Sequence, residues 1–448
     1  MFTPNDILFS RRLFLNRGVQ LLSLAGTLPL FLDRGAQCLA ADFAANPAGA
    51  GRPDDHVLVV LQLAGGNDGL NTVIPLGNDD YLKARPTLGV KKTAALQLTD
   101  EFGLHPSCSG LKHLYDAGDL AIVHAVGYPN ANRSHFRATD IWTTAQPERH
   151  GTSGWLGRYC DAACRGEDPG HASGAKKTTI PETAIALDVE PPPALLGVNY
   201  IPLTFSPANG QGGKGRGRQG QGPQMSGDLV AKLNGAPASP EMMESHRPPS
   251  AGAVETEFIQ RTALNARIYA EKIRNISATI ENKATYPQTQ LGRDFKLIAQ
   301  LIASGMPTRV YYVKLGGFDT HSNQLQNHPR LLEEVSGGIA AFIDDLKQLN
   351  QLNRTTLMTF SEFGRRVHEN GSGTDHGEAA LMFLAGGAVK AGLHGVFPSL
   401  APEKLNRGDV PFTTDFRRVY ATLLNKWMGA DDQKIMGAKF DAVDLLKT

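Results

Sequence analysis

Several apolar runs in this chain end in glycine or small polar residues that are followed directly by acidic, histidine or arginine side chains. The run Val310–Leu315 leads into Gly316-Gly317-Phe318-Asp319-Thr320-His321, so a carboxylate and an imidazole follow a strand-like segment. Continuous apolar runs of this length are typical of strands buried on both faces of a parallel sheet. In open α/β sheets the functional site lies beyond the carboxyl ends of the strands. The pattern therefore predicts an α/β fold with a site at one sheet edge.

Four further clusters of polar residues stand next to apolar runs. Three of them follow a run and the fourth precedes one; they are Gly65-Gly66-Asn67-Asp68, Asn132-Arg133-Ser134-His135, Ser361-Glu362-Phe363-Gly364-Arg365 and Thr374-Asp375-His376-Gly377. Because the carboxyl ends of parallel strands meet at one edge, we expect the five clusters to surround a single crevice.

The rest of the chain alternates strand-like and helix-like patterns. The expected strands are Val57–Leu63, Leu120–Val126, Thr183–Leu187, Arg309–Leu315, Thr355–Phe360 and Leu381–Ala385. The expected helices are Ser107–Ala117, Phe136–Thr144, Val254–Asn282, Leu291–Ser304, Pro329–Leu349 and Asp415–Trp427. Long helices between buried strands predict a three-layer α/β/α sandwich with a mainly parallel central sheet.

Residues 1–40 are expected to be a signal peptide. Arg11-Arg12 precedes the apolar run Val19–Leu32, which is too short for a typical membrane span, and the small residues Ala40-Ala41 offer a cleavage site. This pattern is typical of the twin-arginine pathway, which exports folded bacterial proteins. An arginine pair ahead of a buried helix is the alternative. We predict a periplasmic or secreted protein that meets the twin-arginine export machinery.

The charge balance excludes some classes of partner. Residues 1–40 contain four Arg and two Asp, so 41 of the 45 basic and 42 of the 44 acidic residues lie beyond them. This near-neutral balance argues against a nucleic-acid partner. Beyond residues 1–40 there is no second long apolar run, so we expect no membrane span there. Cys108, Cys160 and Cys164 are too few for a disulfide framework. The sequence leaves open whether Cys160 and Cys164 form a disulfide bond.

We expect residues 41–448 to form one large α/β domain, because early and late clusters must reach the same site. A flexible Gly- and Pro-rich insertion is predicted near residues 205–250, since this stretch offers little apolar surface to bury. Its glycines do not follow a strand, which argues against a nucleotide-binding loop.

Candidate metal ligands are Asp319, His321, Glu362, Asp375 and His376, joined by Asp68. Carboxylates and imidazoles suit zinc, manganese or iron, and the set is large enough for two divalent ions. Asp68 and Ser134 have an alternative interpretation as helix N-caps. As a functional residue, Ser134 would be a nucleophile at a helix N-terminus that favours anions.

The motifs Gly65-Gly66-Asn67-Asp68-Gly69, Gly316–His321, Ser361–Arg365, Thr374–Gly377 and Thr414–Tyr420 resemble those of DUF1501, a family of exported bacterial proteins related to the alkaline phosphatase and sulfatase superfamily. The resemblance implies an alkaline-phosphatase-like fold. It also implies one ion on Asp319, His321 and His376, and a second on Asp68, Glu362 and Ser134, with Asp375 or a water completing the set.

The chain departs from the superfamily pattern at three places, one of which is that His321 is closer to Asp319 than the more usual one-turn spacing. Phe363 follows Glu362 where phosphatases commonly have His, and Ser134-His135-Phe136-Arg137 lacks the proline of the sulfatase motif, which disfavours formylglycine chemistry. We expect an exported metal-dependent hydrolase of small or polymeric phosphate or sulfate esters. A metal-held Ser134 would attack, and Arg133 or Arg365 would clamp the ester oxygens. The alternatives are a non-catalytic exported binding or assembly protein with a degraded site, and a metal-free serine hydrolase built from Ser134, His376 and an aspartate.

Overall fold

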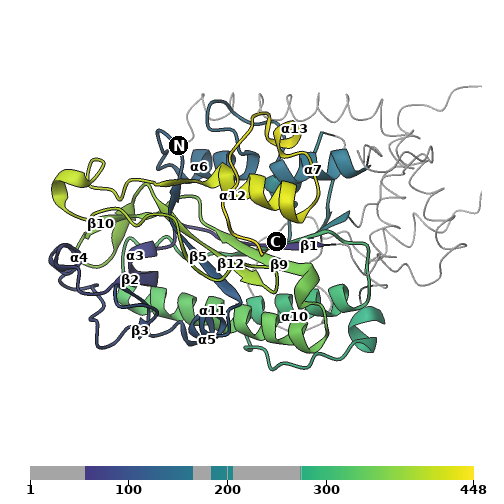
Figure 1. Cartoon of the computed structure of the whole chain (residues 1–448), viewed down its shortest axis with the longest axis horizontal. Helices are drawn as coiled ribbons and strands as arrows, with labels where there is room; N and C mark the ends of the chain where they lie inside the picture. Colours follow the sequence, from purple (N-terminus) through teal and green to yellow (C-terminus); the bar gives the residue numbers. More distant parts are fainter. Residues whose placement is uncertain (1–55, 165–182, 199, 205–272, 274, 448) are drawn as a thin grey trace, which may run out of the picture. The chain divides into compact units, whose positions relative to one another are not determined.

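The computed structural model has a nine-stranded sheet between two layers of helices (Figure 1). It describes residues 56–164, 183–198, 200–204, 273 and 275–447, which belong to one compact unit. The predicted signal peptide (1–40), the insertion near 205–250 and most of the expected helix 254–282 lie outside the described residues. The domain boundaries therefore stay predictions.

Strand order along the sheet is β13-β5-β12-β9-β1-β8-β6-β7, and β14 pairs with β5. Their bounds are β1 Val57–Leu63, β5 Leu120–Gly127, β6 Ala184–Leu187, β7 Leu203–Thr204, β8 Val310–Leu315, β9 Thr355–Phe360, β12 Ala380–Gly386, β13 Gly392–His394 and β14 Thr414–Asp415. All pairings are parallel except those that β12 makes with β5 and β9. The predicted mainly parallel sheet is confirmed.

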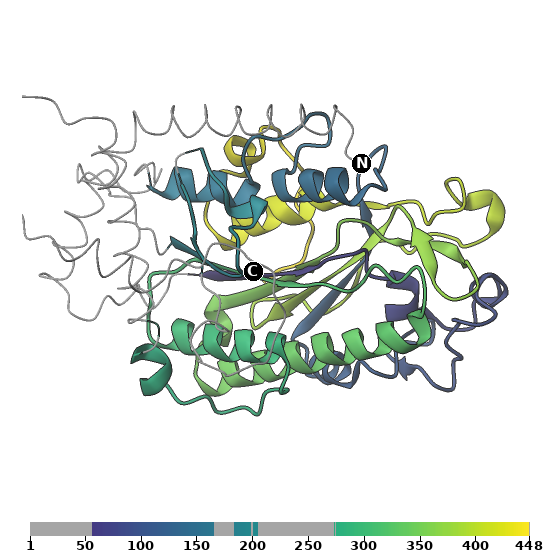
Figure 2. The same cartoon turned by 180° about the vertical axis from the view of Figure 1, so that it is seen from behind.

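Two helical layers cover the sheet, as the views from both sides show (Figures 1 and 2). One layer contains α5 Ser109–Asp116, α10 Gln290–Ala303 and α11 Gln324–Gln348. The other contains α6 His135–Thr144, α7 Trp155–Cys164, α12 Phe416–Thr422, the π-helix Leu423–Trp427 and α13 Asp432–Met436. This is the predicted α/β/α sandwich.

Alternation along β1 shows why both layers are needed. Val57, Val59 and Leu61 belong to the core shared with α5, α10 and α11, whereas Leu58 and Val60 belong to the core shared with α6, α7 and α12. Successive side chains of a strand point to opposite faces, so a strand with apolar residues on both faces has to be covered by helices on both. All of these side chains are buried.

Short elements lie outside the main sheet. One small sheet contains β2 Val73–Pro75, β3 Leu96–Gln97 and β4 Phe102–Leu104, and another contains β10 Arg365–Glu369 and β11 Thr374–His376. The short helices are α3 Gly69–Thr72 and α4 Asp79–Ala84, and the 3-10 turns are Pro193–Leu195, Leu352–Arg354 and Pro402–Lys404. Within the described chain, no helix is sufficiently long and apolar to cross a membrane.

Helix α11 begins five residues before the predicted start at Pro329. Asn323 precedes it with φ of +53°, a left-handed conformation that asparagine tolerates better than most residues. Pro329 therefore lies inside the helix. A proline near a helix start removes only a hydrogen bond of an early turn, so the helix continues through it.

Strand directions bring the five polar clusters to one edge. Strands β1, β8 and β9 are parallel, so the loops after Leu63, Leu315 and Phe360 leave the sheet at the same edge. The strand β12 is antiparallel to both β9 and β5, so β5 ends at that edge and β12 begins there. The fourth cluster therefore reaches the site although it precedes its strand.

Candidate metal centre

The loops after β1 and β8 pack backbone against backbone. Gly65 has φ of +120°, and a Cβ atom on it would lie 2.3 Å from the backbone nitrogen of Asp319. Only glycine combines this conformation with this close approach. The Gly-Gly turn is thus a packing requirement that brings Asp319 beside the end of β1.

The carboxylate of Asp319 lies among three histidines. Its Oδ1 atom is 3.0 Å from Nε2 of His376 and 3.2 Å from Nε2 of His321, and its Oδ2 atom is 3.3 Å from Nε2 of His135. The Nε2 atoms of His321 and His376 are 2.9 Å apart. Four side chains from three different loops therefore converge on one point.

Each imidazole is oriented through its other nitrogen. Nδ1 of His321 lies 3.0 Å from Oδ1 of Asp375, and Nδ1 of His135 lies 3.0 Å from Oε1 of Glu362. Nδ1 of His376 lies 2.8 Å from the carbonyl oxygen of Arg133. Carboxylate and carbonyl oxygens accept, so each neutral ring carries its proton on Nδ1. All three Nε2 atoms then present lone pairs to the same point.

Acceptors that converge without a hydrogen between them form a site that suits a cation. The ligand atoms of His135, Asp319 and His376 all lie within 4.8 Å of one another. Histidines whose outer nitrogen donates to a carboxylate or carbonyl are the usual arrangement around protein-bound metals. The donor set fits a divalent ion such as zinc, manganese or iron.

The electrostatics keep these groups in the forms that bind metals. Partial burial opposes ionisation of Asp319, but the hydrogen bond and the charge of Arg365 lower its pKa to about 2. Burial lowers the pKa of His376 below its usual value. Hydrogen bonds from Asn370 and His321 lower the pKa of Asp375. At neutral pH the site therefore contains charged carboxylates and a neutral His376.

Glu362 also lies beside the ligand cluster, and its two carboxylate oxygens have different surroundings. Its Oε1 atom accepts hydrogen bonds from the backbone nitrogen of Gly65, at 2.8 Å, and from His135. Its Oε2 atom is buried and has no hydrogen-bond partner among the described residues. A buried carboxylate oxygen without a donor is costly, so this atom also fits a cation nearby.

Arg365 does not contact solvent, contrary to its predicted role as an ester clamp. Its guanidinium group donates to Asp319 at 2.8 Å and to the backbone oxygens of Phe318, Thr374, Gly65 and Gly66. The side chain is fully buried. Arg365 therefore holds the loops together and positions Asp319.

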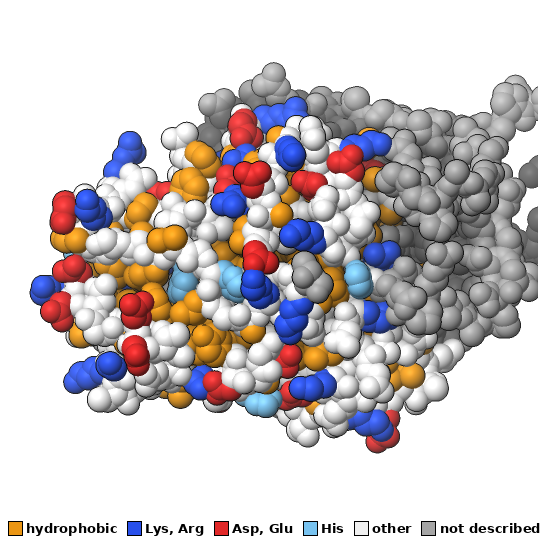
Figure 3. Space-filling view, viewed as in Figure 1, with side chains coloured by type: hydrophobic (Ala, Val, Ile, Leu, Met, Phe, Trp, Pro, Cys, Tyr) orange, Lys and Arg blue, Asp and Glu red, His pale blue; other side chains and the backbone are white. Residues whose placement is uncertain are grey.

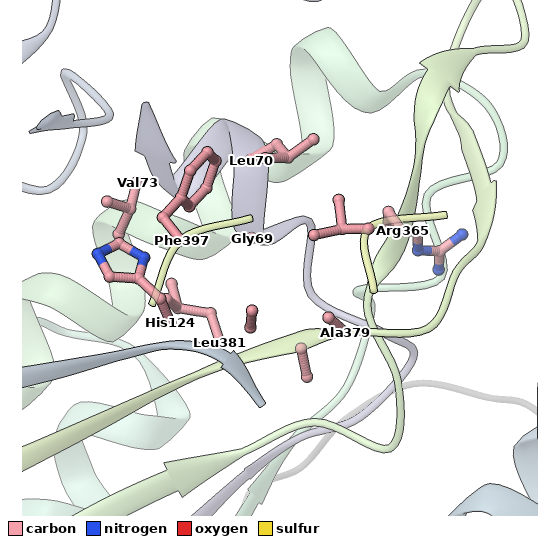
Figure 4. Close-up of a pocket in the computed structure, with 11 residues that line it drawn as sticks. Gly69, Leu70, Val73, His124, Arg365, Ala379, Leu381 and Phe397 are labelled. Carbon is pink, nitrogen blue, oxygen red and sulfur yellow. The ribbon is translucent and has the colours of Figure 1, made fainter. Parts of the chain in front are cut away.

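A small apolar pocket of about 30 Å³ lies behind Arg365 (Figure 4). His124 and Phe397 line one end, and Arg365 lies at the other with its guanidinium group turned away from His124. His124 is 4% exposed, its Nε2 atom has no hydrogen-bond partner among the described residues, and burial lowers its pKa to about 4. The pocket is large enough for about one water molecule, so it is part of the packing.

Asp68 is separated from the histidines by its own partners. Nη1 of Arg85 lies 2.6 Å from Oδ2 of Asp68, and Nε2 of Gln324 donates to the same oxygen at 2.5 Å. Asp68 also caps α3 by accepting from the backbone nitrogen of Asn71. Burial would raise its pKa, but the charge and hydrogen bond of Arg85 lower it. The second predicted ion would have to compete with this arginine.

Ser134 and Arg133 lie in the loop that ends at α6. Ser134 is exposed at the N-cap position, and its hydroxyl makes no hydrogen bond with the described residues. Arg133 forms an ion pair with Asp409 and is about two-fifths exposed. The side chain that reaches Asp319 from this loop is His135, one residue further along. Neither Ser134 nor Arg133 is placed on the ligand cluster itself.

Two important residues were not among the sequence-predicted ligands. His135 belongs to the cluster Asn132–His135, and its position after the N-cap residue is the signal that could have indicated it. Arg85 gives no such signal, because it follows a short helix far from every motif. In the view of Figure 3, histidine side chains reach the surface among apolar and charged groups. Cys160 is buried, and the side chain of Cys164 lies outside the described residues.

Comparisons with known proteins add the following. No curated protein matches this chain in sequence. Among solved structures, PsFucS1 sulfatase from Pseudoalteromonas sp. is similar with a TM-score of 0.37 and 11% identity, over 93% of this chain and 75% of that one. Lipoteichoic acid synthase LtaP from Listeria monocytogenes is similar with a TM-score of 0.31 and 8% identity, over 82% and 77%. Residues 224–440 match the model of DUF1501, a protein family of unknown function, and the resemblance that the motifs indicated is thereby confirmed.

Proposed function

We propose that this protein is an exported, metal-dependent hydrolase of phosphate or sulfate esters. The observation that supports the proposal is the convergence of three Nε2 lone pairs on Asp319. The residues that would hold the ion are His135, Asp319, His321 and His376. A bound divalent ion would supply Lewis-acid polarisation of an ester oxygen and activation of a hydroxyl or water nucleophile.

One ion is favoured over the two that the sequence predicted. Asp68 already has Arg85 as its cation, and Glu362 orients His135 through Oε1. In this arrangement Arg365, Asp375 and the carbonyl oxygen of Arg133 act as positioning groups. They fix the carboxylate and the rings, and such outer partners are expected to matter for metal affinity by about 10- to 100-fold.

Ser134 is the proposed nucleophile. Its hydroxyl is exposed, precedes the ligand His135, and stands at the N-terminus of the ten-residue helix α6, where backbone N–H groups favour anions. Attack of its oxygen on the ester phosphorus or sulfur would form a serine ester and release the alcohol. Water would then cleave the serine ester, returning the hydroxyl and releasing the inorganic anion.

A second candidate is a binding protein without catalysis. It is favoured by the buried ion pairs of Arg85 with Asp68 and of Arg365 with Asp319. Because of these pairs, neither arginine offers a fixed positive charge at the ligand cluster for an ester oxygen. The metal-free serine hydrolase has less support, since Nε2 of His376 faces Asp319 and His321 rather than a serine hydroxyl.

Metal content and turnover together test the proposal. We expect about one zinc, manganese or iron ion per chain after native export, and turnover of an activated phosphate or sulfate ester that chelation abolishes and the metal restores. His135→Ala should lose the ion. His113→Ala, the same change at a surface histidine paired with Asp344, should keep it. An ion-free parent protein would contradict the metal centre, and an ion without turnover would favour the binding protein.

A further inference from the structure

A polar cavity of about 490 Å³ lies beside the candidate metal centre. It is lined by residues 130–133, by the turn 406–409 and by Glu378. The backbone oxygen of Arg133 accepts the hydrogen bond from Nδ1 of His376, so one wall of the cavity is also an outer wall of the metal centre. The volume falls within the range of about 300–1,000 Å³ that small-molecule sites commonly have.

The walls of this cavity suit hydroxyl groups. Asn130, Asn132 and Asn406 contribute amides, and Ala131 is the single apolar residue of the lining. Oδ1 of Asn132 already accepts from the backbone nitrogen of Ser134, and Nδ2 of Asn406 donates to Glu378, so Asn132 offers a donor and Asn406 an acceptor. A hydroxyl group also donates and accepts, so several amides around one space match a ligand with many hydroxyls. The lining has no aromatic ring on which a nucleobase could stack, and little apolar surface for a lipid chain.

The acidic groups of the lining are already satisfied. Asp409 is buried and forms ion pairs with Arg133 and Arg366. Glu378 accepts from Nδ2 of Asn406 at 2.6 Å and from the backbone nitrogen of Phe412 at 3.3 Å. Arg407, by contrast, is exposed, and its guanidinium group makes no ion pair or hydrogen bond with the described residues. The cavity thus has one uncommitted positive charge.

The backbone at Arg407 adds an independent observation. Asn406 and Asp409 exchange backbone hydrogen bonds of 2.9 and 3.1 Å around the two-residue turn Arg407-Gly408, which has φ values of +56° and +88°. Turns with two positive φ values strongly prefer asparagine, aspartate or glycine at the first position. Arginine is disfavoured there, and strained residues of this kind cluster at ligand sites.

We propose that the cavity binds a sugar that carries an acidic group, with Arg407 on the acid and the asparagine amides on the hydroxyls. The inference rests on the proposed function, because it makes this sugar the part of the substrate that holds the ester at the neighbouring metal centre. A guanidinium group binds carboxylate and sulfate oxygens through paired hydrogen bonds, which explains the choice of an acidic ligand.

Binding without turnover tests this assignment separately from catalysis. The Ser134→Ala protein is titrated by calorimetry with a set of disaccharides, each with and without one uronic acid, and with sodium sulfate. We expect at least one uronate to bind, and the neutral counterpart to bind about tenfold to a hundredfold more weakly, as loss of a charge-assisted hydrogen bond predicts.

Arg407→Asn should weaken binding of that uronate by a similar factor while leaving the melting temperature unchanged or higher, because asparagine suits the turn. Lys404→Asn removes the same charge nearby, outside the lining, and should change neither property. Sulfate binding as tightly as the uronates, or no binding by any disaccharide, would overturn the sugar assignment. Uronate binding without metal-dependent turnover in the parent would leave this site standing and remove the proposed hydrolase.

Discussion

Nη1 of Arg85 lies 2.6 Å from Oδ2 of Asp68, and both side chains are completely buried. The same guanidinium group donates to Oδ1 of Asn71 and to the backbone oxygens of Arg366 and Val367. A carboxylate that the sequence indicates as a metal ligand is therefore neutralised by an arginine that also joins α3 to β10. Arg85 thus supplies the positive charge that a metal ion would otherwise have to supply to Asp68.

This pair should make a large, non-additive contribution to stability. Arg85→Met leaves the buried charge of Asp68 without an ion-pair partner, so we expect the free energy of unfolding to fall by about 3–5 kcal/mol. The double variant Arg85→Met/Asp68→Asn should lose less than the two single losses combined, because no uncompensated charge remains. Urea unfolding of all four proteins measures this coupling, and simple additivity would contradict it.

Ser134 and His135 should separate chemistry from metal binding. Ser134→Ala removes the proposed nucleophile, so turnover should collapse while metal content is retained. If the serine is only the N-cap residue of α6, the change should leave turnover intact, and stability should change little because the hydroxyl makes no capping hydrogen bond. Rates and metal content, measured on one preparation, distinguish the outcomes, with the parent protein as control.

Acid should destabilise the protein partly through His124. Its pKa is about 4 in the folded protein because it is buried. The unfolded chain binds a proton there at a pKa of about 6.5, so stability is lost as pH falls from about 6.5 to about 4, by at most about 1.4 kcal/mol per pH unit. His124→Phe should reduce this slope in urea unfolding at several pH values, whereas the surface change His113→Gln should not. Equal slopes for the parent and His124→Phe would argue against burial of a neutral ring.

Export should depend on the paired arginines. Replacing Arg11 and Arg12 with Lys keeps the charge but removes the pattern that the twin-arginine receptor reads, so the precursor should stay in the cytoplasm. Arg17→Lys, in the same segment, should be exported normally. Cell fractionation measures the outcome, and an unchanged periplasmic yield for the paired change would rule this route out.

The fold follows closely from the pattern of apolar runs. Strands β1 and β9 have the predicted bounds, because their residues are apolar apart from buried threonines in β9 and the buried Gln62 in β1, and each run ends where a loop begins. The predicted start of helix α11 was the least accurate of the helix bounds, since Pro329 resembles a helix start but lies inside the helix. Local signals fix an element more reliably than its first residue.

The site was less predictable, because ligand choice depends on side-chain direction. Ser134 and His135 are neighbours, and only the helix that begins at His135 decides which of them faces Asp319. The ion pair of Asp68 with Arg85 could not be predicted for another reason. Arg85 reaches it over a sequence separation of seventeen residues and from outside every motif, so no local pattern reveals that the aspartate has a partner.

The sheet order has a consequence for how the chain is made. Within the described residues, β1 pairs with β8 and β9, and β5 pairs with β12, β13 and β14. Both early strands thus pair with strands that the ribosome produces about 250 residues later, and pairing over such separations is slow. When synthesis has reached residue 300, the apolar strands β1 and β5 still have no partner strand. The ligand residues that follow residue 300 have not been made, so the ligand cluster cannot form. We therefore expect chaperones to hold this chain during synthesis, and metal to enter only after β12 has closed the sheet.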